Sequence, residues 1–499
     1  MAPAALATDP RRIARIKAAR AAYDAGRPAE AVSLLEALLR HGPPDIEALA
    51  TLGSARLALF DVEGAIAAYS RAAELAPKVS ALALLTGHAY KQAHRPTEAG
   101  RWYQKATALA PHDAEGWIAL AWSMRELGQP IEAIACCHRA AMLDPTLEDA
   151  PFIEGCAYHD LGRFDDARRV FDRLAAANPD NDAVAWNRAL LLFLEGRWPE
   201  AWAAAERRHE SPKRLGHFRD LPGVPWRGEA LDGKTILVQL EQGLGDQVQF
   251  LRYCQPLKAR GARVIFEASP PLVSLLRRSP YLDEIITKGA PRPPFDYSAH
   301  LMSLPFLLNT GADLLADALP PFAEVGEPSA ALRTACEVPD ARVGLVWGGE
   351  PKHHNDRNRS IGLAALTPLL EIPGIHWFSL QKGAREAELR TLPPALRARI
   401  SDLAPMLTDF SETAQAVRLL DLVITVDTSV AHIAGSLGVP TWILLPFVPD
   451  WRWMAHGETT GWYPSVRLWR QPARGDWASV VHEVDTMLRA GLADAQQAR

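Results

Sequence analysis

A period of 34 residues runs through the first 210 residues and constrains the fold of this chain more than any other feature. Alanine recurs at this step, and proline follows it in phase: Ala31, Ala65, Ala99, Ala133, Ala167 and Ala201, with Pro43, Pro77, Pro111, Pro145 and Pro179. Glycine keeps the same phase at Gly26, Gly128, Gly162 and Gly196, while Phe60 and His94 stand in its place elsewhere. Because two residue types hold one period, the pattern predicts a stack of repeated units rather than an unrelated set of helices.

Each period has the composition of a helix, a turn and a second helix. Glycine permits the backbone conformation of the turn, and proline prevents the second helix from continuing. One such hairpin cannot bury its apolar face, whereas a stack can. The pattern resembles the tetratricopeptide repeat, and about six repeats fit between residues 11 and 210. The resemblance implies a superhelix whose concave face holds a protein segment; a spacer or dimerisation scaffold is the alternative.

The composition changes after the repeats. Residues 211–233 are rich in proline and glycine and are interpreted as a linker. Residues 234–239 and 263–267 then have the apolar character of buried strands, with a glycine loop and a helical segment at 247–260 between them. A second series of strands is predicted at 343–347, 376–380, 422–426 and 441–445. We therefore expect an α/β region of two doubly wound halves with a cleft between them, 234–338 and 339–492.

Charge and cysteine content exclude several classes of protein. The net charge is -5, so a generally basic nucleic-acid binder is not expected. The five cysteines form no CxxC pair, which leaves no readable disulfide framework or zinc site. No segment has the uninterrupted apolar length of a signal peptide or a membrane span. We expect a cytoplasmic protein.

Short motifs in the α/β region carry a more specific resemblance. They are Gln242-Gly-Leu-Gly-Asp246, Val343-Gly-Leu-Val-Trp-Gly-Gly349 with Asn355-Asp-Arg-Asn-Arg-Ser360, Ser379-Leu-Gln-Lys-Gly383 and Asp427-Thr-Ser-Val-Ala-His432, followed by Asp450-Trp-Arg-Trp453 and Trp462-Tyr-Pro464. Together they resemble the GT-B glycosyltransferases related to bacterial heptosyltransferases, in the variety fused to tetratricopeptide repeats. A weaker similarity is to the O-linked N-acetylglucosamine transferases. The resemblance implies a nucleotide-sugar donor as substrate, inversion at the sugar carbon, and no metal or cofactor.

The segment 427–432 is the predicted site of the donor diphosphate. Asp427 follows a strand and opens a helix, whose first N–H groups and positive dipole end suit an anion. Thr428 and Ser429 add hydroxyl donors, and the resemblance places His432 near the donor phosphates. Helix capping by Asp or Thr is the alternative role.

Cations after a second glycine turn are predicted to stabilise the departing diphosphate. Lys352 and Arg359 follow Gly348-Gly349, and Ser360 closes the same motif. Gln381 and Lys382 follow another strand and are expected to contact nucleotide or phosphate, with a solvated loop as the alternative. The α/β region has no Asp-x-Asp metal motif, and the adjacent histidines at 353 and 354 are interpreted as surface residues.

The glycine loop after the first strand is assigned to the acceptor side. Gly243 and Gly245 allow close backbone approach, but position 248 is valine, so the dinucleotide-binding pattern GxGxxG is absent. The resemblance places Asp246 opposite the acceptor, as a candidate general base. A helix N-cap is its alternative role, and Glu241 is the second candidate carboxylate.

These features predict a glycosyltransferase whose repeats recruit an acceptor protein, with flagellin as one bacterial candidate. Transfer to an envelope polysaccharide or lipopolysaccharide is one alternative, and a non-catalytic adaptor that keeps the fold is the other. Six late tryptophans could stack on sugars, but packing is the preferred interpretation: Trp442, Trp451, Trp453, Trp462, Trp469 and Trp477.

Overall fold

The computed structural model describes residues 10–209, 221–310, 322, 325–353 and 355–497. Its contacts divide the chain into two units, Met1–Asp180 and Asn181–Arg499. Two predictions concern residues outside the described ones: residues 211–220 of the predicted linker, and residue 354, the second of the adjacent histidines.

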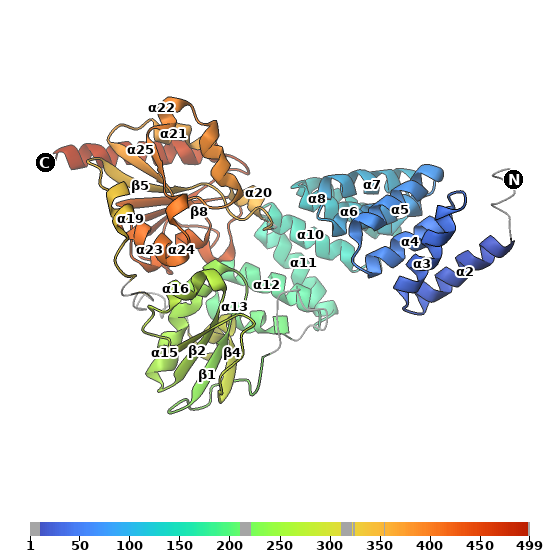
Figure 1. Cartoon of the computed structure of the whole chain (residues 1–499), viewed down its shortest axis with the longest axis horizontal. Helices are drawn as coiled ribbons and strands as arrows, with labels where there is room; N and C mark the ends of the chain where they lie inside the picture. Colours follow the sequence, from blue (N-terminus) through green and yellow to red (C-terminus); the bar gives the residue numbers. More distant parts are fainter. Residues whose placement is uncertain (1–9, 210–220, 311–321, 323–324, 354, 498–499) are drawn as a thin grey trace. The chain divides into compact units, whose positions relative to one another are not determined.

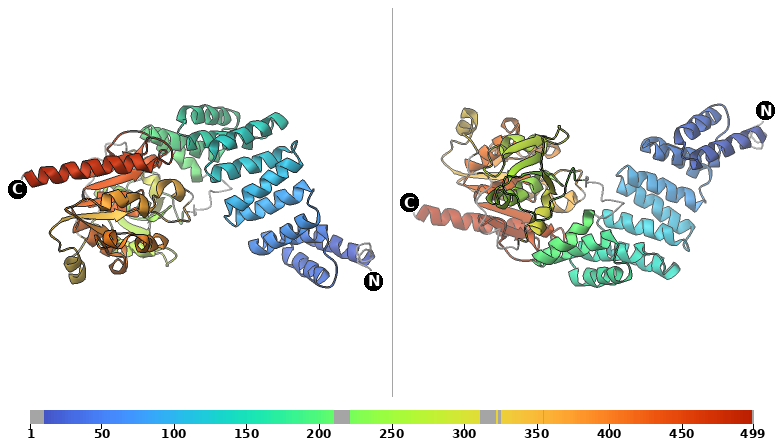
Figure 2. Two further views of the ribbon diagram at one scale, coloured as in Figure 1. Left: turned by 90° about the horizontal axis from the view of Figure 1, so that it is seen from above. Right: turned by 90° about the horizontal axis from the view of Figure 1, so that it is seen from below.

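The first unit is all helical, and its helices stack in antiparallel pairs (Figures 1 and 2). They are α2 (Pro10–Asp24), α3 (Pro28–Arg40), α4 (Ile46–Ala58), α5 (Val62–Leu75), α6 (Ser80–Gln92), α7 (Pro96–Leu109), α8 (Ala114–Glu126), α9 (Pro130–Leu143), α10 (Asp149–Asp160) and α11 (Phe164–Ala177). The predicted hairpins are confirmed, since every turn falls where the repeat places its glycine or its substitute.

The turns share one backbone conformation whatever residue they carry. Gly26, Gly128 and Gly162 have φ between 72° and 77°. Phe60 and His94, which replace glycine, have φ of 62° and 56°. Residues other than glycine rarely adopt this left-handed backbone conformation, so the packing of the flanking helices imposes it on Phe60 and His94.

Glycines inside the helices let neighbouring helices come close to aromatic rings. A Cβ on Gly87 would lie 2.5 Å from the ring of Tyr103, and one on Gly53 would lie 2.7 Å from the ring of Tyr69. Both tyrosines are fully buried. The repeat therefore pairs a small residue on its first helix with a large ring on its second, which keeps the two backbones at a constant separation.

We expect Gly87→Ala to destabilise the repeats, although alanine favours helix. Overpacking costs about 1–3 kcal/mol, more than the gain of up to about 1 kcal/mol in helix propensity. Gly116→Ala on α8 is the matched control, because its Cβ would meet nothing closer than 3.5 Å. Urea unfolding of the fragment 1–180 measures both. Equal free energies of unfolding for the two variants would contradict the packing account.

The second unit opens with one more hairpin and continues with two parallel sheets (Figure 1). The hairpin consists of α12 (Asp182–Leu194) and α13 (Trp198–Ala205) and ends in the short helix η1 (Glu206–His209). The first sheet has the order β3-β2-β1-β4: β1 (Thr235–Gln239), β2 (Arg263–Ala268), β3 (Glu284–Thr287) and β4 (Tyr297–His300). The second has the order β10-β9-β8-β5-β6-β7: β5 (Ala341–Val346), β6 (Ile375–Ser379), β7 (Ile400–Asp402), β8 (Leu422–Val426), β9 (Thr441–Leu445) and β10 (Val466–Arg470).

Helices and short helical turns connect these strands. In the first half they are α14 (Leu244–Phe250), η2 (Leu251–Tyr253), α15 (Cys254–Ala259), η3 (Pro270–Leu272), α16 (Val273–Leu276), η4 (Leu301–Ser303) and α17 (Leu304–Leu307). In the second half they are α19 (Ala330–Ala335), α20 (Asp356–Arg359), η5 (Leu363–Leu366), α21 (Thr367–Leu370), η6 (Ala384–Thr391), α22 (Pro394–Arg397), η7 (Ala404–Met406), α23 (Phe410–Arg418), α24 (Ser429–Ser436), η8 (Trp451–Trp453) and α25 (Trp477–Gln497).

The strands predicted from their apolar runs are confirmed, and the structure adds four more. The added strands β3, β4, β7 and β10 all lie at sheet edges. Strands β3 and β7 are mostly half-buried, and β4 and β10 contain serine, histidine or arginine, so none of the four has the continuous apolar run that marks a central strand. The helix expected at 247–260 begins earlier, at Leu244, and breaks at η2. Pro256 has no N–H for the carbonyl of Arg252, which accounts for the break.

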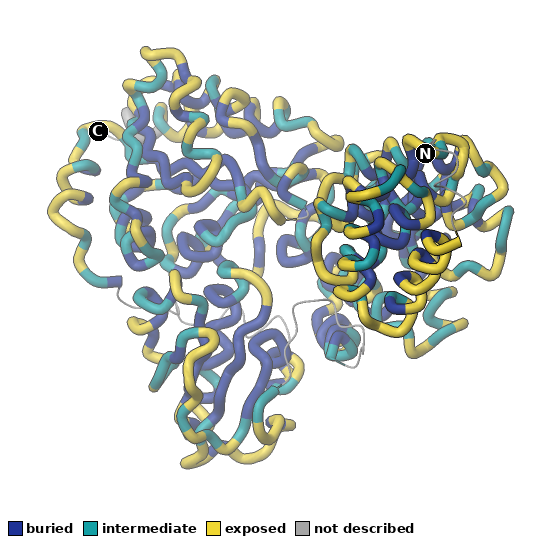
Figure 3. Tube along the Cα trace, turned by 45° about the vertical axis from the view of Figure 1, so that its right-hand side comes forward, coloured by how far each residue is buried: buried dark blue, intermediate teal, exposed yellow. Residues whose placement is uncertain are grey.

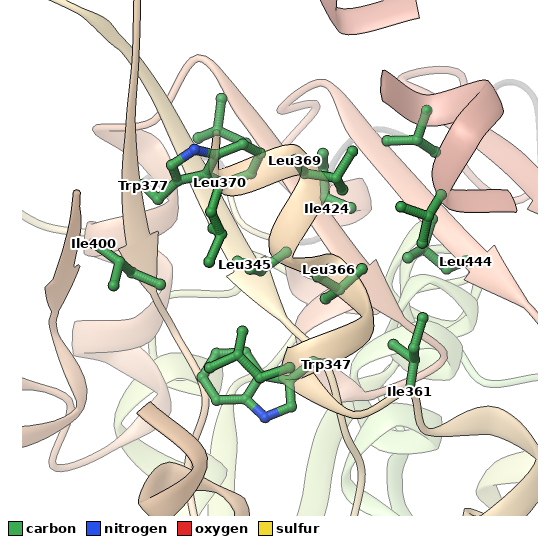
Figure 4. Packing of buried hydrophobic residues seen from close by; sticks show 14 of the residues in the cluster. Leu345, Trp347, Ile361, Leu366, Leu369, Leu370, Trp377, Ile400, Ile424 and Leu444 are labelled. Atoms are coloured by element: carbon green, nitrogen blue, oxygen red, sulfur yellow. The ribbon is translucent and has the colours of Figure 1, made fainter. Parts of the chain in front are cut away.

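The second sheet contains the larger apolar core. Leu345, Trp347, Trp377 and Ile424 lie within it, between the sheet and α21 and α25 (Figure 4). Figure 3 shows the buried central strands flanked by exposed turns. Trp453 and Trp462 are buried, so the packing role preferred for the late tryptophans is confirmed for them. Among the described residues, none of the helices has the length and apolar character needed to cross a membrane.

Candidate functional site

Each sheet has one point where the strand order reverses, and the predicted motifs lie beside these points. In the first sheet the reversal is between β1 and β4, and the loop 241–246 follows β1. In the second sheet the reversal is between β5 and β8; the segment 347–349 follows β5, and the segment 427–429 follows β8. Ligands of open α/β sheets bind at such switch points, at the carboxyl ends of the strands.

Asp246 occupies the first turn of α14, at the third helical position. Its Oδ2 accepts a hydrogen bond of 2.8 Å from the N–H of Gly243, the residue before the helix. This is the carboxylate half of a capping box, so Asp246 helps to start the helix without being its N-cap. A structural role for this carboxylate therefore exists beside any chemical one.

The start of α24 is open in the way that an anion site needs. Thr428 is its N-cap residue, with extended backbone, but its side chain makes no capping hydrogen bond. Its Oγ1 lies 3.2 Å from Oγ1 of Thr425 instead. Asp427, Thr428 and Ser429 are half-buried. The first N–H groups of α24 are thus not satisfied by the side chain of the N-cap residue.

The helices α14 and α24 pack against each other, which brings the two sets of motif residues together. Gly245 lies directly against His432: a Cβ at Gly245 would fall 2.7 Å from Cδ2 of the imidazole. Any larger residue at 245 would push the two helix starts apart. Glycine at this position is therefore required by contact between the halves of the unit.

His432 is buried and held from two sides. Its Nδ1 lies 2.9 Å from the hydroxyl of Tyr463, and its ring stacks on Trp453 with centroids 5.4 Å apart. Burial, together with the charge of Arg452, lowers the pKa of His432 to about 3. The imidazole is therefore neutral near pH 7, and it can offer a hydrogen bond but no positive charge to a phosphate.

Arg452 joins the two halves of this site. Its guanidinium pairs with Asp246 of the first half, and it donates to Asp450 at 2.7 Å and to Gln249 at 2.9 Å. Burial opposes the charged form, but Asp246 and Asp450 outweigh it and raise the pKa of Arg452. The sequence analysis placed Asp450 and Arg452 in a motif of the resemblance but gave them no role. Two charged residues within an otherwise aromatic segment were the sequence signal that could have indicated a role in the site.

The carboxylates around Arg452 differ in their acidity. Burial, and then the charge of Asp450, raises the pKa of Asp427 to about 6, although Arg359 acts in the opposite direction. Burial also raises the pKa of Asp246. For Asp450, burial is outweighed by Arg452, and its pKa is lowered. Asp427 is thus the carboxylate that can change its charge near neutral pH.

Of the predicted cations and polar groups on the donor side, one contacts the start of α24, two hold a turn and two are exposed. Arg359 reaches the site, where its Nη1 donates 3.0 Å to the backbone carbonyl of Asp427. Ser360 and Gln381 instead hold the turn after β5: Ser360 accepts from the N–H of Gly349 at 2.9 Å, and Gln381 accepts from that of Gly348 at 2.9 Å. Lys352 is exposed on the following loop. Lys382 is also exposed, and its Nζ donates to the carbonyl of Ala404.

Glu241 is buried in an ion pair and does not join Asp246. Arg208 donates to its Oε2 at 3.1 Å, and the N–H of Met302 donates to the same oxygen at 2.9 Å. Among the residues that the structure describes, His209, Glu241 and His300 bring ligand atoms within 4.8 Å of one another, a spacing that a metal could use. The guanidinium on the same carboxylate disfavours a second cation there.

Comparison with known proteins agrees with the two parts of the chain. Tetratricopeptide-repeat family models match residues 16–80, 114–147 and 154–214. The model of glycosyltransferase family 9 (heptosyltransferase) matches residues 364–444, which include α24 and the Asp427–His432 segment. The chain therefore carries tetratricopeptide repeats in its N-terminal region and a family 9 glycosyltransferase segment in its C-terminal region. This supports glycosyl transfer as its activity.

A curated relative and several solved structures are also similar. The chain is 27% identical to Protein FlbA of Caulobacter vibrioides over 503 residues, covering 88% of this chain and 83% of that one. A tetratricopeptide repeat protein from Parabacteroides merdae is 18% identical, with a TM-score of 0.38, over 40% of this chain and 79% of that one. A structure of MamA is 23% identical, with a TM-score of 0.31, over 35% and 94%.

The raised pKa of Asp427 predicts that binding of a nucleotide sugar depends on pH. The diphosphate of such a donor keeps its charges over this range, so affinity should rise as pH falls from about 7.5 to about 5.5 and Asp427 takes up a proton. Asp427→Asn should flatten this dependence. His432 stays neutral and Asp450 stays charged across this pH range, so neither contributes to the dependence. The pKa of Asp246 is also raised, and the variant Asp246→Asn measures how much of the pH dependence comes from that carboxylate. Calorimetry at several pH values tests this, and an unchanged slope in Asp427→Asn would contradict it.

Proposed function

We propose that this chain transfers a sugar from a nucleotide-sugar donor to an acceptor protein recruited by its repeats, using two sheets in the GT-B arrangement. One observation supports this most directly. The open start of α24, with Arg359 on the carbonyl of Asp427, lies against the start of α14, which carries Asp246. An anion site and a carboxylate thus come from opposite halves of one unit, as transfer between a donor and an acceptor requires.

The proposed reaction is a direct displacement that inverts the sugar carbon without a metal. The acceptor hydroxyl attacks the anomeric carbon, its proton passes to Asp246, and the bond to the diphosphate oxygen breaks. Burial raises the pKa of Asp246, which strengthens it as a base. Arg359 and the N–H groups of α24 face the leaving group and stabilise its charge.

Asp246 retains room for this role despite its contacts. One carboxylate oxygen accepts from Gly243 and the other from Arg452. Each oxygen of a carboxylate has two acceptor positions, so a hydroxyl can still donate to it. The same contacts favour a second candidate function, a non-catalytic adaptor, because an ion pair with Arg452 also explains why an aspartate is present.

The acceptor is proposed to be a protein because repeat stacks of this kind present an extended concave surface. Flagellin is one candidate. A panel of nucleotide sugars first identifies the donor by thermal shift, since a ligand at about 100 times its Kd adds about 2.7 kcal/mol of stability. Intact-mass analysis of candidate acceptors incubated with that donor then tests transfer. An enzyme that binds no nucleotide sugar and adds no mass would favour the adaptor.

Arg359→Ala and His432→Ala should both weaken nucleotide binding. The loss should be larger for Arg359, about tenfold or more, because it removes a charge-assisted contact, whereas His432 is neutral. Arg342→Ala is the matched control: this arginine pairs with Asp421 on the exposed side of the unit, at the opposite ends of β5 and β8. Calorimetry measures all three variants. Unchanged affinity in both site variants would contradict the donor assignment.

Asp246→Asn should reduce turnover by about 10²–10⁴-fold while nucleotide affinity is retained. Asparagine keeps an oxygen for the N–H of Gly243 but cannot accept the proton. Asp450→Asn is the comparison, because it removes another carboxylate from Arg452 and leaves Asp246 in place. If both variants lose stability alike but only Asp246→Asn loses turnover, the carboxylate acts chemically. Near-normal turnover in Asp246→Asn would exclude it as the base.

A further inference from the structure

The last repeat hairpin, α12 with α13, packs three large aromatic rings against the α/β part of the second unit. Phe193 stacks on Trp451 with centroids 4.3 Å apart and planes inclined by 29°. Trp202 meets the same tryptophan edge to face at 5.6 Å, and Trp198 meets Trp462 at 5.7 Å. With Phe250 of α14, 5.7 Å from Trp202, these residues form what we call the aromatic cluster.

The aromatic cluster is directly joined to the candidate site. Trp451 is the neighbour of Arg452 in the chain, and the guanidinium of Arg452 lies over its ring, 4.3 Å from the centroid. The indole N–H of Trp462 donates to the carbonyl of Arg452 at 3.0 Å. The backbone is tied as well, since the N–H of Ala455 donates to the carbonyl of Leu194 at 3.1 Å. The hairpin thus contacts the chain both before Arg452, at Trp451, and after it, at Ala455.

A second contact connects the hairpin to the segment that leads from β1 into α14, the helix that carries Asp246. Arg208, in η1 after α13, forms its buried ion pair with Glu241, which lies between β1 and α14. The exposed side-chain fractions of the two partners are 1% and 2%. Breaking a buried pair leaves an uncompensated charge, which is strongly unfavourable. The segments on both sides of the Arg452–Asp246 ion pair are therefore in contact with the same repeat hairpin and its terminal turn η1.

We infer that this hairpin, α12 with α13, is a positioning element of the transferase site. Phe193 holds Trp451, and Trp451 sets the place of Arg452 between Asp246 and Asp450. The catalytic part of this inference rests on the proposed function, whereas its structural part does not. The repeats then do more than recruit an acceptor, because their last hairpin completes the site itself.

Phe193→Leu in the full-length chain tests this, because it removes the ring stack and keeps an apolar side chain. Hydrogen exchange measured by mass spectrometry should be faster by about fivefold or more in residues 450–463. Exchange in β5 and β6 should stay as in the wild type. The matched control is Phe266→Leu, an equally buried phenylalanine on β2 of the first sheet. Unchanged exchange at 450–463, or an equal rise in the control, would overturn the inference.

A second measurement separates positioning from a general loss of stability. With UDP-glucose as the first probe, followed by the other members of the nucleotide-sugar panel, affinity is measured against pH for the wild type and both variants. Phe193→Leu should weaken binding and shift the pH profile, since the burial of Asp427 and the charges of Asp450 and Arg452 all influence its pKa. Phe266→Leu should leave the profile in place, and a profile unchanged in both variants would overturn the inference. If the wild type bound none of these sugars, the proposed function would fail, and hydrogen exchange would still decide whether the hairpin holds the loop.

Discussion

One buried guanidinium fixes the geometry of the candidate site. Arg452 is surrounded by the carboxylates of Asp246 and Asp450, with the charge of Asp427 nearby. A buried charge is tolerated only when it is paired, so the loops that supply these carboxylates are held to one arrangement. Burial, and then the charge of Asp450, raises the pKa of Asp427, although Arg359 and Arg452 act in the opposite direction. Asp427 lies where a diphosphate is proposed to bind, so binding of the diphosphate and protonation of Asp427 are coupled.

Aromatic packing supports this polar centre from behind. Rings give large buried area, and their preferred edge-to-face and offset contacts hold definite angles. Trp451 and Trp453 flank Arg452 in sequence; the first stacks on Phe193 of the last repeat hairpin, and the second stacks on His432. Residues from distant parts of the second unit therefore fix the same short segment. A repeat hairpin that packs in this way is as much a part of the transferase region as of the repeat series.

Sequence could predict the elements whose signals are local. The 34-residue period identified the hairpins, and apolar runs identified the central strands. It could not show which contacts Gln381, Ser360 and Glu241 make within the protein, because a polar residue beside a ligand and one that holds a turn look alike in sequence. In the structure Gln381 and Ser360 hold the turn after β5, and Glu241 pairs with Arg208. The edge strand β4 was also missed, because its buried residues include the polar Ser298 and His300 and so form no apolar run.

The sequence by itself determined that the chain has a repeat region and a parallel α/β region, since periodicity and buried strands depend on neighbours along the chain. It also placed Asp246, Asp427 and His432 in motifs that follow strands. Only the tertiary structure decided that α14 and α24 meet, that Gly245 must be small against His432, and that Arg452 pairs with Asp246. These contacts join residues about two hundred positions apart, as the Arg452–Asp246 separation of 206 shows. Burial and charge at such contacts depend on packing in three dimensions, which no local pattern encodes.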